Sequence, residues 1–386
     1  MTKKFLSGNE AFALGVCLAK PHVISAYPIT PQTTVVEKLS ELVESGELKS
    51  EFIHVESEHS ALSAAIGASA VGARTFTATS SQGLLYMAEC LTYASGGRFP
   101  IVMMNANRST ALPWNIYGDQ RDSLSLLDHG WIQAYAEDAQ EALDLALMSF
   151  YVAEHKDVAT PFMANLDGFT LTHTYEVVDV PNAEQADEFL PPYETDNKLS
   201  FDDPKNLGFS AGPDTNTEFK YKEHLGILNA CKVIKECEDK FFKIFNRKYS
   251  GLIETYKTED ADFVIVTLGT ISGLVKEVVD DLRDKGQKVG LLRIRYLRPF
   301  PNEEIVEALK NVKAIGVLEK DISFGNEGTV YTNVNSALHK AKLDVVSSNY
   351  IAGLGGRNIE KHQIEDIFTR LQSLNHEIVF VGLKEE

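Results

Sequence analysis

The feature that most constrains the fold is the alternation of short apolar segments, rich in β-branched residues, with longer amphipathic segments. The alternation runs over residues 1–165 and resumes at residue 261, after a polar and turn-rich stretch. Parallel strands need long crossover connections, which are usually helices, so this alternation predicts a parallel sheet with helices on both faces. We therefore predict an α/β chain, with a doubly wound parallel-sheet domain followed by a second α/β domain.

The turn-rich stretch between the two α/β regions is longer than an ordinary loop. Over residues 181–223 the periodic pattern fails, and a long helix is predicted at 225–249. The aromatic residues Phe201, Phe209 and Tyr221 predict that this stretch is an extended arm lying on a surface. The predicted parts are residues 1–180 (first domain), 181–258 (arm and connecting helix) and 259–386 (second domain).

Individual elements follow from apolar periodicity, capping residues and turn residues. Strands are predicted at 22–27, 52–55, 75–79, 100–104, 161–166, 262–268, 289–297, 314–319 and 378–381. Helices are predicted at 7–19, 34–44, 58–71, 82–94, 136–154, 225–249, 271–285, 303–309 and 360–374. The helix at 58–71 is so rich in small residues that we expect it to be buried.

The composition excludes several classes of partner. Lysine and arginine number 37 against 55 acidic residues, and the net charge of −18 argues against nucleic acid or an anionic membrane. No apolar run reaches the roughly 18 residues of a membrane span, and the polar residues at 8–10 argue against a secretory signal. The four cysteines form no C-x-x-C motif, so we predict no iron–sulfur cluster and no metal site in this chain, and a cytoplasmic location.

A loop bounded by two prolines follows the predicted strand at 22–27. Pro28 and Pro31 fix their own φ angles and lack N–H donors, and Pro31 restricts Thr30 to extended geometry. Ligands of open α/β sheets bind at the carboxyl ends of the strands. Tyr27–Pro31 is therefore a candidate site presenting the Thr30 hydroxyl, although a rigid loop with a helix-capping threonine explains the same residues.

Three further candidates also stand where a predicted strand ends. Glu58 begins a helix, where the helix dipole favours a carboxylate and burial opposes its charge. Arg108 follows another strand, and a guanidinium there suits bidentate binding of a small carboxylate. The loop at 79–83 can offer hydroxyls and backbone N–H groups to a ligand. A helix-start acid and a surface ion pair are the structural alternatives for Glu58 and Arg108.

These segments occur in an order and at a spacing that resemble a known family. The chain reads Y-P-I-T-P at 27–31, V-E-S-E-H-S-A at 55–61, T-F-T-A-T-S-S-Q-G at 75–83 and N-R at 107–108. Together they resemble the alpha subunits of the 2-oxoacid:ferredoxin oxidoreductases, most closely the pyruvate branch. Further likeness lies in 114–116, Asp119, Asp122 and 128–133, and in the second domain at 298–301, 318–320, 322–325 and 353–357. The glycines of that last segment lack dinucleotide-binding spacing and predict a tight turn.

The resemblance implies a pyrimidine-binding thiamine-diphosphate domain followed by a transketolase C-terminal-like domain. It also implies a thiamine diphosphate shared with a beta subunit, which supplies the diphosphate- and Mg²⁺-binding half. Gamma- and delta-type subunits would carry [4Fe-4S] clusters, ferredoxin or another low-potential carrier would accept the electrons, and CoA would be a co-substrate. This division of labour accounts for the missing cluster cysteines.

The resemblance also implies roles for individual residues. Glu58 would bond the aminopyrimidine ring of the cofactor, Arg108 would hold the substrate carboxylate, and Thr30 would bond the carboxylate or keto oxygen. The other cofactor-binding residues would be Tyr27, Pro28, Ile29, Ser81 and Gln82.

The expected reaction is oxidative decarboxylation of pyruvate to acetyl-CoA and CO₂. Oxalate-using relatives place an arginine where this chain has Thr30, which disfavours a dicarboxylate. Residues 109–112 depart from the small apolar run of the pyruvate enzymes, which leaves 2-oxoisovalerate, phenylglyoxylate or another bulkier 2-oxoacid open. A non-catalytic structural subunit and a transketolase-like or dehydrogenase E1-type transferase are the alternatives of other classes.

Overall fold

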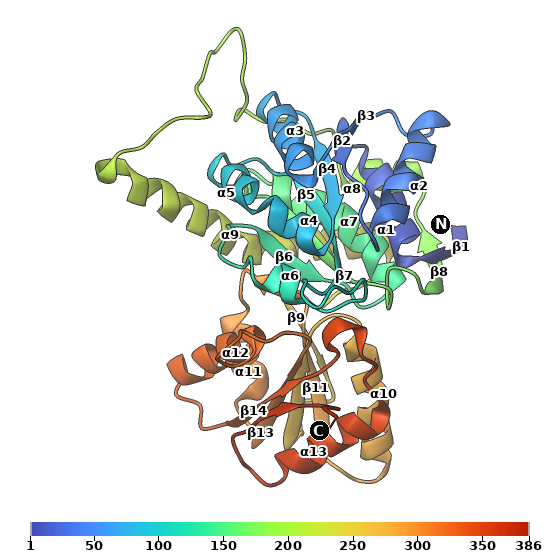
Figure 1. Ribbon diagram of the computed structural model, residues 1–386, viewed down its shortest axis with the longest axis vertical. Coiled ribbons are helices and arrows are strands. Elements are labelled where there is room, and N and C mark those ends of the chain that lie inside the picture. The colour runs from blue at the N-terminus through green and yellow to red at the C-terminus, as the bar shows by residue number, and fades with distance from the viewer. Residues whose placement is uncertain (1, 385–386) are drawn as a thin grey trace.

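Two mainly parallel sheets, one in each half of the chain, organise the computed structural model, which describes residues 2–384 (Figure 1). The first sheet contains, in spatial order, β12 (Tyr296–Arg298), β6 (Ile132–Tyr135), β7 (Phe162–Asp167), β5 (Val102–Asn107), β4 (Thr75–Thr79), β2 (Val23–Ala26) and β3 (Glu51–His54). All its neighbours are parallel except β12, which runs antiparallel to β6. The predicted doubly wound parallel sheet is confirmed.

The second sheet has a similar architecture and supports the second α/β unit. It contains β15 (Ile378–Phe380), β14 (Val346–Ile351), β13 (Ala314–Glu319), β10 (Phe263–Thr267), β11 (Val289–Ile294) and β9 (Ile253–Tyr256). Only β9 is antiparallel to its neighbour. One face carries α10 (Ile271–Asp284) and α13 (Lys361–Leu371), and the other carries α11 (Asn302–Leu309) and α12 (Thr329–Lys340).

Two separate apolar clusters cover the two faces of the first sheet. Strand β5 shows why, because successive side chains of a strand point to opposite faces. Val102 and Met104 belong to one cluster and Met103 to the other. The first cluster is formed with α1 (Gly8–Ala19), α2 (Thr33–Glu44), α7 (Ala139–Glu154) and α9 (Pro213–Phe245), and the second with α3 (Glu58–Ala70), α4 (Ser81–Tyr86) and α5 (Ala88–Gly96).

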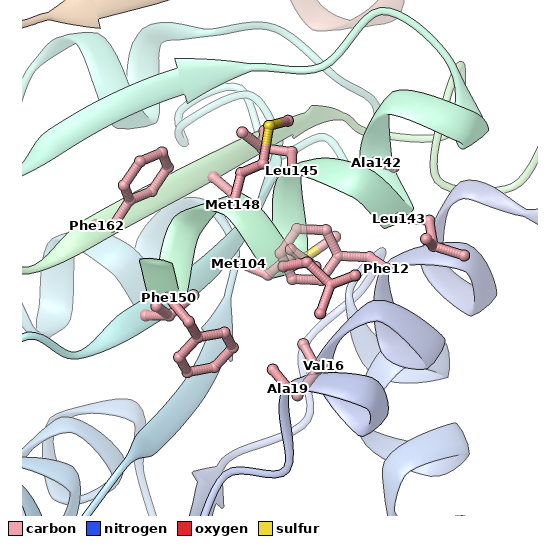
Figure 2. Packing of buried hydrophobic residues seen from close by; sticks show 14 of the residues in the cluster. Phe12, Val16, Ala19, Met104, Ala142, Leu143, Leu145, Met148, Phe150 and Phe162 are labelled. Carbon is pink, nitrogen blue, oxygen red and sulfur yellow. The ribbon is translucent and has the colours of Figure 1, made fainter. Parts of the chain in front are cut away.

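The contact between α1 and α7 is the densest part of the first cluster. Figure 2 shows Phe12 and Val16 of α1, Leu143 and Met148 of α7, and Met104 of β5 among the packed side chains of this cluster. Helix α1 opens with the predicted capping box, in which the Ser7 side chain accepts a hydrogen bond from the Glu10 N–H. Because Gly15 lacks a side chain, α1 approaches α7 closely: a Cβ atom there would lie 2.5 Å from the Leu143 carbonyl oxygen.

The predicted strand at 289–297 is in fact two strands that belong to different sheets. β11 ends at Ile294, Arg295 intervenes, and β12 then pairs with β6 of the first sheet. The physical reason is a pair of buried arginines at the crossing. Arg293 and Arg295 both bind the Glu141 carboxylate at the start of α7, and Arg295 also binds Glu238 of α9. A segment that ties two sheets together has no local signature in its apolar pattern.

Two short strands pair across the predicted boundary at residue 259. β9 lies before that boundary but pairs with β11 of the second sheet, whereas β12 lies beyond it and pairs with the first. Strand pairing depends on distant residues, which is why the turn-rich composition of the linker did not mark the division.

Two predicted helices differ from the structure. The helix predicted at 82–94 is divided at Met87, which has non-helical dihedrals (φ −93°, ψ 10°) between α4 and α5. The helix at 58–71 forms as α3, but it is not buried throughout. Only five of its thirteen residues are buried, because no element within residues 2–384 covers its outer face, where Gly67 has open space.

The arm also differs from its prediction. α9 begins at Pro213, twelve residues before the predicted start, and the turn-rich stretch contains α8 (Ala183–Phe189). Figure 1 shows the segment before α9 as a long loop leaving the body of the first unit. Its inner part is attached, since the Leu199 N–H donates to Ala70 O at 2.8 Å. Its tip is not packed on this chain, because Phe201 is fully exposed.

Several elements were absent from the sequence prediction. They are β1 (Thr2–Ser7) and β8 (Tyr175–Val180), which pair with each other, the edge strand β9, the inner strands β6 and β14, and the helices α6 (Arg121–Leu124), α8 and α12. Over residues 2–384, no helix combines the length and the apolar character needed to cross a bilayer.

Candidate active site

Thr30 and Arg108, predicted as partners in one pocket, are in direct contact. The Arg108 Nη1 donates a hydrogen bond to the Thr30 carbonyl oxygen at 2.9 Å, and the Trp114 ring lies 5.5 Å from the guanidinium carbon. Arg108 is buried, and burial lowers the pKa of its guanidinium, against the opposing effect of the nearby Asp122 charge. The helix α2 begins at Thr33 with Gln32 as its cap, so Thr30 is not the helix-capping residue of the alternative reading.

Buried side chains hold the proline-bounded loop in place. Gln32 is fully buried and donates from Nε2 to the Ala78 carbonyl of β4 at 2.8 Å. Asn9 of α1 donates to the Pro31 carbonyl at 2.8 Å. The loop is therefore fixed both to the sheet and to α1, which leaves the exposed Thr30 side chain at a defined place.

Asp122 joins the loop after β4 to the end of β5. Its carboxylate accepts hydrogen bonds from the backbone N–H groups of Ser81 and Arg108, both at 3.1 Å, and from the Asn107 side chain at 2.8 Å. Two more come from Asn105 and the Ser123 N–H. Burial raises the pKa of Asp122 to about 6, although five N–H donors favour its charged form. This one buried carboxylate sets the spacing between Ser81 and Arg108.

Glu58 lies against the loop that follows β4. A Cβ atom on Gly83 would come 2.6 Å from Oε1 of Glu58 and 2.7 Å from Oγ1 of Thr79, so only glycine fits between them. The Ser57 side chain caps α3 by accepting from the Ser60 N–H, and Glu58 itself is 8% exposed. Among the residues that the structure describes, none donates a hydrogen bond to the Glu58 carboxylate.

Unpaired polar atoms gather at the carboxyl ends of β4 and β5. Within residues 2–384, the buried oxygens Thr79 Oγ1, Asn107 Oδ1 and Ser109 Oγ have no hydrogen-bond partner. Buried polar groups are nearly always paired in folded proteins, so a group of unpaired ones at a ligand-binding edge indicates a place where a ligand completes the bonding.

The remaining predicted residues are less tightly placed. Ser81 is fully buried, and its Oγ lies 2.7 Å from Ser109 O and 2.6 Å from Gln82 Oε1, so its single proton can be donated to either acceptor. Tyr27 and Pro28 are exposed, and Ile29 donates from its N–H to Gln32 Oε1 at 3.3 Å. The structure thus joins Thr30, Arg108 and Ser81 in one network, brings Glu58 against the adjacent turn, and leaves Tyr27 on the surface.

The carboxyl edges of the two sheets face each other across this site. Asp167, at the end of β7, accepts from the Thr270 N–H at 2.9 Å and from Gln120 at 3.1 Å, and pairs with Lys320 at 3.2 Å. The pKa of Asp167 is lowered: burial acts to raise it, but the Lys320 charge and the Thr270 hydrogen bonds outweigh burial. The second unit therefore closes one side of the site.

Sequence reasoning did not identify the residues that hold the site together. Asp122 contributed to the family resemblance but received no role, and Gln32 and Asn9 received none. The available signal was chemical: buried side chains with several donors or acceptors, placed beside strand ends. Their burial could not be read from the sequence, because each stands next to polar neighbours.

The fold and the site together define a class of α/β protein with a ligand site at the carboxyl edge of a parallel sheet. Residues 14–239 match the family model described as pyruvate flavodoxin/ferredoxin oxidoreductase, thiamine-diphosphate-binding. Residues 261–364 match pyruvate:ferredoxin oxidoreductase core domain II. The chain belongs to the pyruvate:ferredoxin oxidoreductase family, and is an oxidoreductase subunit of the 2-oxoacid:ferredoxin type.

Two relatives and one solved structure show how far this likeness extends. The chain is 46% identical to the pyruvate synthase subunit PorA of Methanothermobacter thermautotrophicus, over 100% of both chains. It is 47% identical to the ketoisovalerate oxidoreductase subunit VorA of Pyrococcus horikoshii, over 95% of this chain and 92% of that one. Both names describe subunits, so these relatives are parts of multisubunit assemblies.

The solved structure is the 2-oxoglutarate:ferredoxin oxidoreductase from Magnetococcus marinus with 2-oxoglutarate, coenzyme A and succinyl-CoA bound. Its fold matches with a TM-score of 0.72 at 20% sequence identity. The match covers 96% of this chain but only 65% of that longer chain. This likeness supports the fold of both units, consistent with the predicted fold class.

Proposed function

We propose that this chain is the catalytic alpha-type subunit of a CoA-dependent 2-oxoacid:ferredoxin oxidoreductase whose substrate is pyruvate. Pyruvate and CoA would yield acetyl-CoA and CO₂, and two electrons would pass to two one-electron acceptors such as ferredoxin. The observation that carries the proposal is the buried Arg108 guanidinium, held by Thr30 O at the same strand edge as Glu58, whose carboxylate has no hydrogen-bond donor within residues 2–384.

The residues at this edge fit thiamine diphosphate. Glu58 supplies a carboxyl group with no partner in the described chain, Gly83 leaves room beside it, and the Thr79 hydroxyl is buried and unpaired. An aminopyrimidine ring offers both a ring nitrogen and an amino group, which match an acid and a hydroxyl. When bound, the cofactor supplies the electron sink for loss of CO₂. Glu58 would share a proton with the ring, and Ile29, Ser81 and Gln82 would line its place.

Arg108 and Thr30 would bind the substrate. A guanidinium matches the geometry of a carboxylate, and its burial strengthens the attraction. The Thr30 carbonyl accepts from Arg108, and the hydroxyl of the same residue would donate to the carboxylate or keto oxygen. Two anionic groups would need a second cation here, and Thr30 provides none, which favours a monocarboxylate.

We also propose the partners that the family resemblance implies. A beta-type subunit would bind the diphosphate and Mg²⁺, and gamma- and delta-type subunits would carry [4Fe-4S] clusters toward ferredoxin. The subunit names of the relatives support an assembly of this kind. CoA would enter as the acyl acceptor.

A second candidate substrate is 2-oxoisovalerate. The pyruvate and ketoisovalerate relatives are equally similar to this chain, at 46% and 47% identity. The segment that follows Arg108 carries the large side chains Leu112 and Trp114, which are 86% and 67% exposed. Such side chains can form an apolar wall for a branched substrate.

The deciding experiment is a panel of 2-oxoacids on the purified complex, with CoA, thiamine diphosphate and viologen as acceptor. We expect the highest kcat/KM with pyruvate. A higher value with 2-oxoisovalerate or phenylglyoxylate would replace the substrate but keep the chemistry. Turnover without CoA or without reduction of the acceptor would contradict the reaction itself.

A further inference from the structure

The glycine turn Gly353–Gly356 of the second unit reaches the substrate site of the first. Its Gly355 carbonyl accepts a hydrogen bond from the Asn115 side chain at 2.8 Å, and its Gly355 N–H donates to Asp119 at 2.9 Å. We infer that Asn115 is a positioning residue, through which this turn fixes the Arg108 guanidinium for binding the 2-oxoacid carboxylate. The inference rests on the proposed function of Arg108.

Asn115 is bound on three sides. Its Nδ2 donates to Gly355 O, its Oδ1 accepts from the Tyr117 N–H at 2.7 Å, and its own carbonyl oxygen accepts from Arg108 Nε at 3.2 Å. The side chain is thus fixed by the second unit and by its own loop, while the backbone of the same residue contacts the guanidinium. A shift of this side chain moves the carbonyl that orients Arg108.

The turn is shaped for this contact. Gly355 and Gly356 have positive φ angles of 62° and 80°, which favour glycine. A Cβ on Gly355 would lie 2.7 Å from Asn115 Nδ2, and a Cβ on Gly356 would collide with the Tyr117 side chain. The segment was predicted as a tight turn without a role in binding, and its two glycines allow the loop of the first unit to lie directly on it.

The contacts with the carbonyl oxygens of Asn115 and Thr30 leave Nη2 of the Arg108 guanidinium available to a ligand. Nε is used by Asn115 O, and Nη1 donates to Thr30 O. Within residues 2–384, Nη2 has no hydrogen-bond partner. A carboxylate can bind a guanidinium along its Nε–Nη2 edge or at its Nη1–Nη2 end. Because the single N–H of Nε is occupied, the substrate carboxylate would bind at the Nη1–Nη2 end.

The central test is Asn115→Asp in the assembled complex. This change keeps the size of the side chain and the oxygen that accepts from Tyr117, but it replaces the donor to Gly355 with an oxygen. We expect the KM for the 2-oxoacid to rise about tenfold, with kcat and the KM for CoA changed less than twofold. A merely structural role would lower assembly or kcat and would leave this KM unchanged.

Two further variants make the test specific. Gly355→Ala displaces the Asn115 amide from the opposite side and should raise the same KM, and it decides the matter if the Asn115→Asp complex does not assemble. Asn197→Asp is the matched control, because Asn197 also donates from Nδ2 to a glycine carbonyl, that of Gly97 at 3.0 Å, on the remote arm. It should leave every kinetic constant unchanged.

A double-mutant cycle tests whether Asn115 acts through Arg108. With Arg108→Lys already present, adding Asn115→Asp should raise the KM by less than twofold. Lysine lacks the planar guanidinium that Asn115 would orient, so this orienting effect is already lost. A KM within twofold of wild type for both Asn115→Asp and Gly355→Ala would overturn the inference while the wild-type complex still turns over. A wild-type complex inactive on all 2-oxoacids would instead overturn the proposed function.

Discussion

The two helical layers on the first sheet contrast sharply, although both consist of helices rich in small residues. In α7, 13 of 16 residues are buried, whereas in α3 only 5 of 13 are. Gly15 of α1 meets the backbone of α7, since a Cβ there would lie 2.5 Å from Leu143 O, but Gly67 of α3 has nothing within 4 Å. The layer that contains α1 and α7 is covered by this chain itself, and we call it the closed layer. The layer that contains α3, α4 and α5 has an uncovered outer face on α3 within residues 2–384, and we call it the open layer.

The acids of the two layers differ in the same way. Glu141 of α7 is buried and paired with Arg293 and Arg295, and these charges lower its pKa to about 2 despite the opposing effect of burial. Glu58 of α3 has no donor among the described residues and faces the loop after β4. The closed layer therefore holds the two units together, whereas the open layer keeps an acid available for chemistry.

The largest expected effect is on the open layer, from Glu58→Gln. If Glu58 shares a proton with the cofactor, this change should lower kcat by about 10²- to 10⁴-fold, the range for lost general acid–base groups. The melting temperature should stay the same, because no hydrogen bond to Glu58 is lost within residues 2–384. Steady-state viologen reduction and calorimetry measure the two quantities.

Glu56→Gln is the control for this change, since Glu56 is exposed and only two residues away. It should leave kcat unchanged. Normal activity of the Glu58→Gln complex would show that the open layer carries no catalytic acid and would favour the structural-subunit alternative.

The next largest effect is on the closed layer, from Arg293→Met. Removing one partner of a buried ion pair typically costs about 3–5 kcal/mol, because the other charges stay buried without compensation. Here Glu141 would keep only Arg295 as a cationic partner, and Glu137 and Glu254, each 3.0 Å from Arg293, would keep only Lys276. Denaturant unfolding should show this loss, and the KM for the 2-oxoacid should be that of the wild type.

Lys38→Met provides the corresponding surface control, because the exposed Lys38–Glu41 pair lies on α2. Such exposed pairs contribute less than about 1 kcal/mol. An equal loss from both changes would mean that the buried network is not what stabilises the junction.

Acid should weaken the closed layer through Glu141. Its folded pKa of about 2 lies below the ordinary 4.5, so the stability it contributes is present above pH 4.5 and is lost as the pH falls from 4.5 toward 2. The difference in melting temperature between wild type and Glu141→Gln should therefore shrink over this interval. A difference that is constant with pH would exclude this linkage.

The smallest effects are expected from the two glycines, and they have opposite signs. Gly15→Ala should destabilise by about 1–3 kcal/mol, because the added methyl group collides with the α7 backbone. Gly67→Ala should stabilise the isolated chain by about 0.5–1 kcal/mol, because alanine is the better helix former and the site is open. A loss of stability from Gly67→Ala in the complex alone would show that a partner covers the open layer.

Much of the fold could be predicted because its signals are local. Neighbouring residues determine the strand β4, the capping box of α1 and the end of β2 before Pro28. β14 escaped prediction because its buried Ser348 and Asn349 make it read as polar. These side chains are satisfied by bonds to Asn375 O and Glu319, residues distant in sequence.

The sequence by itself determined the alternation of strands and helices, the proline-bounded loop, and the residue types Thr30, Glu58 and Arg108 at strand ends. These depend on backbone restriction, periodicity and side-chain chemistry, which act over a few residues. Only the tertiary structure decided that β12 returns to the first sheet, that Asp122 links two strand ends, and that α3 stays open. Those outcomes depend on which distant surfaces meet, and such contacts form only when the whole chain has folded.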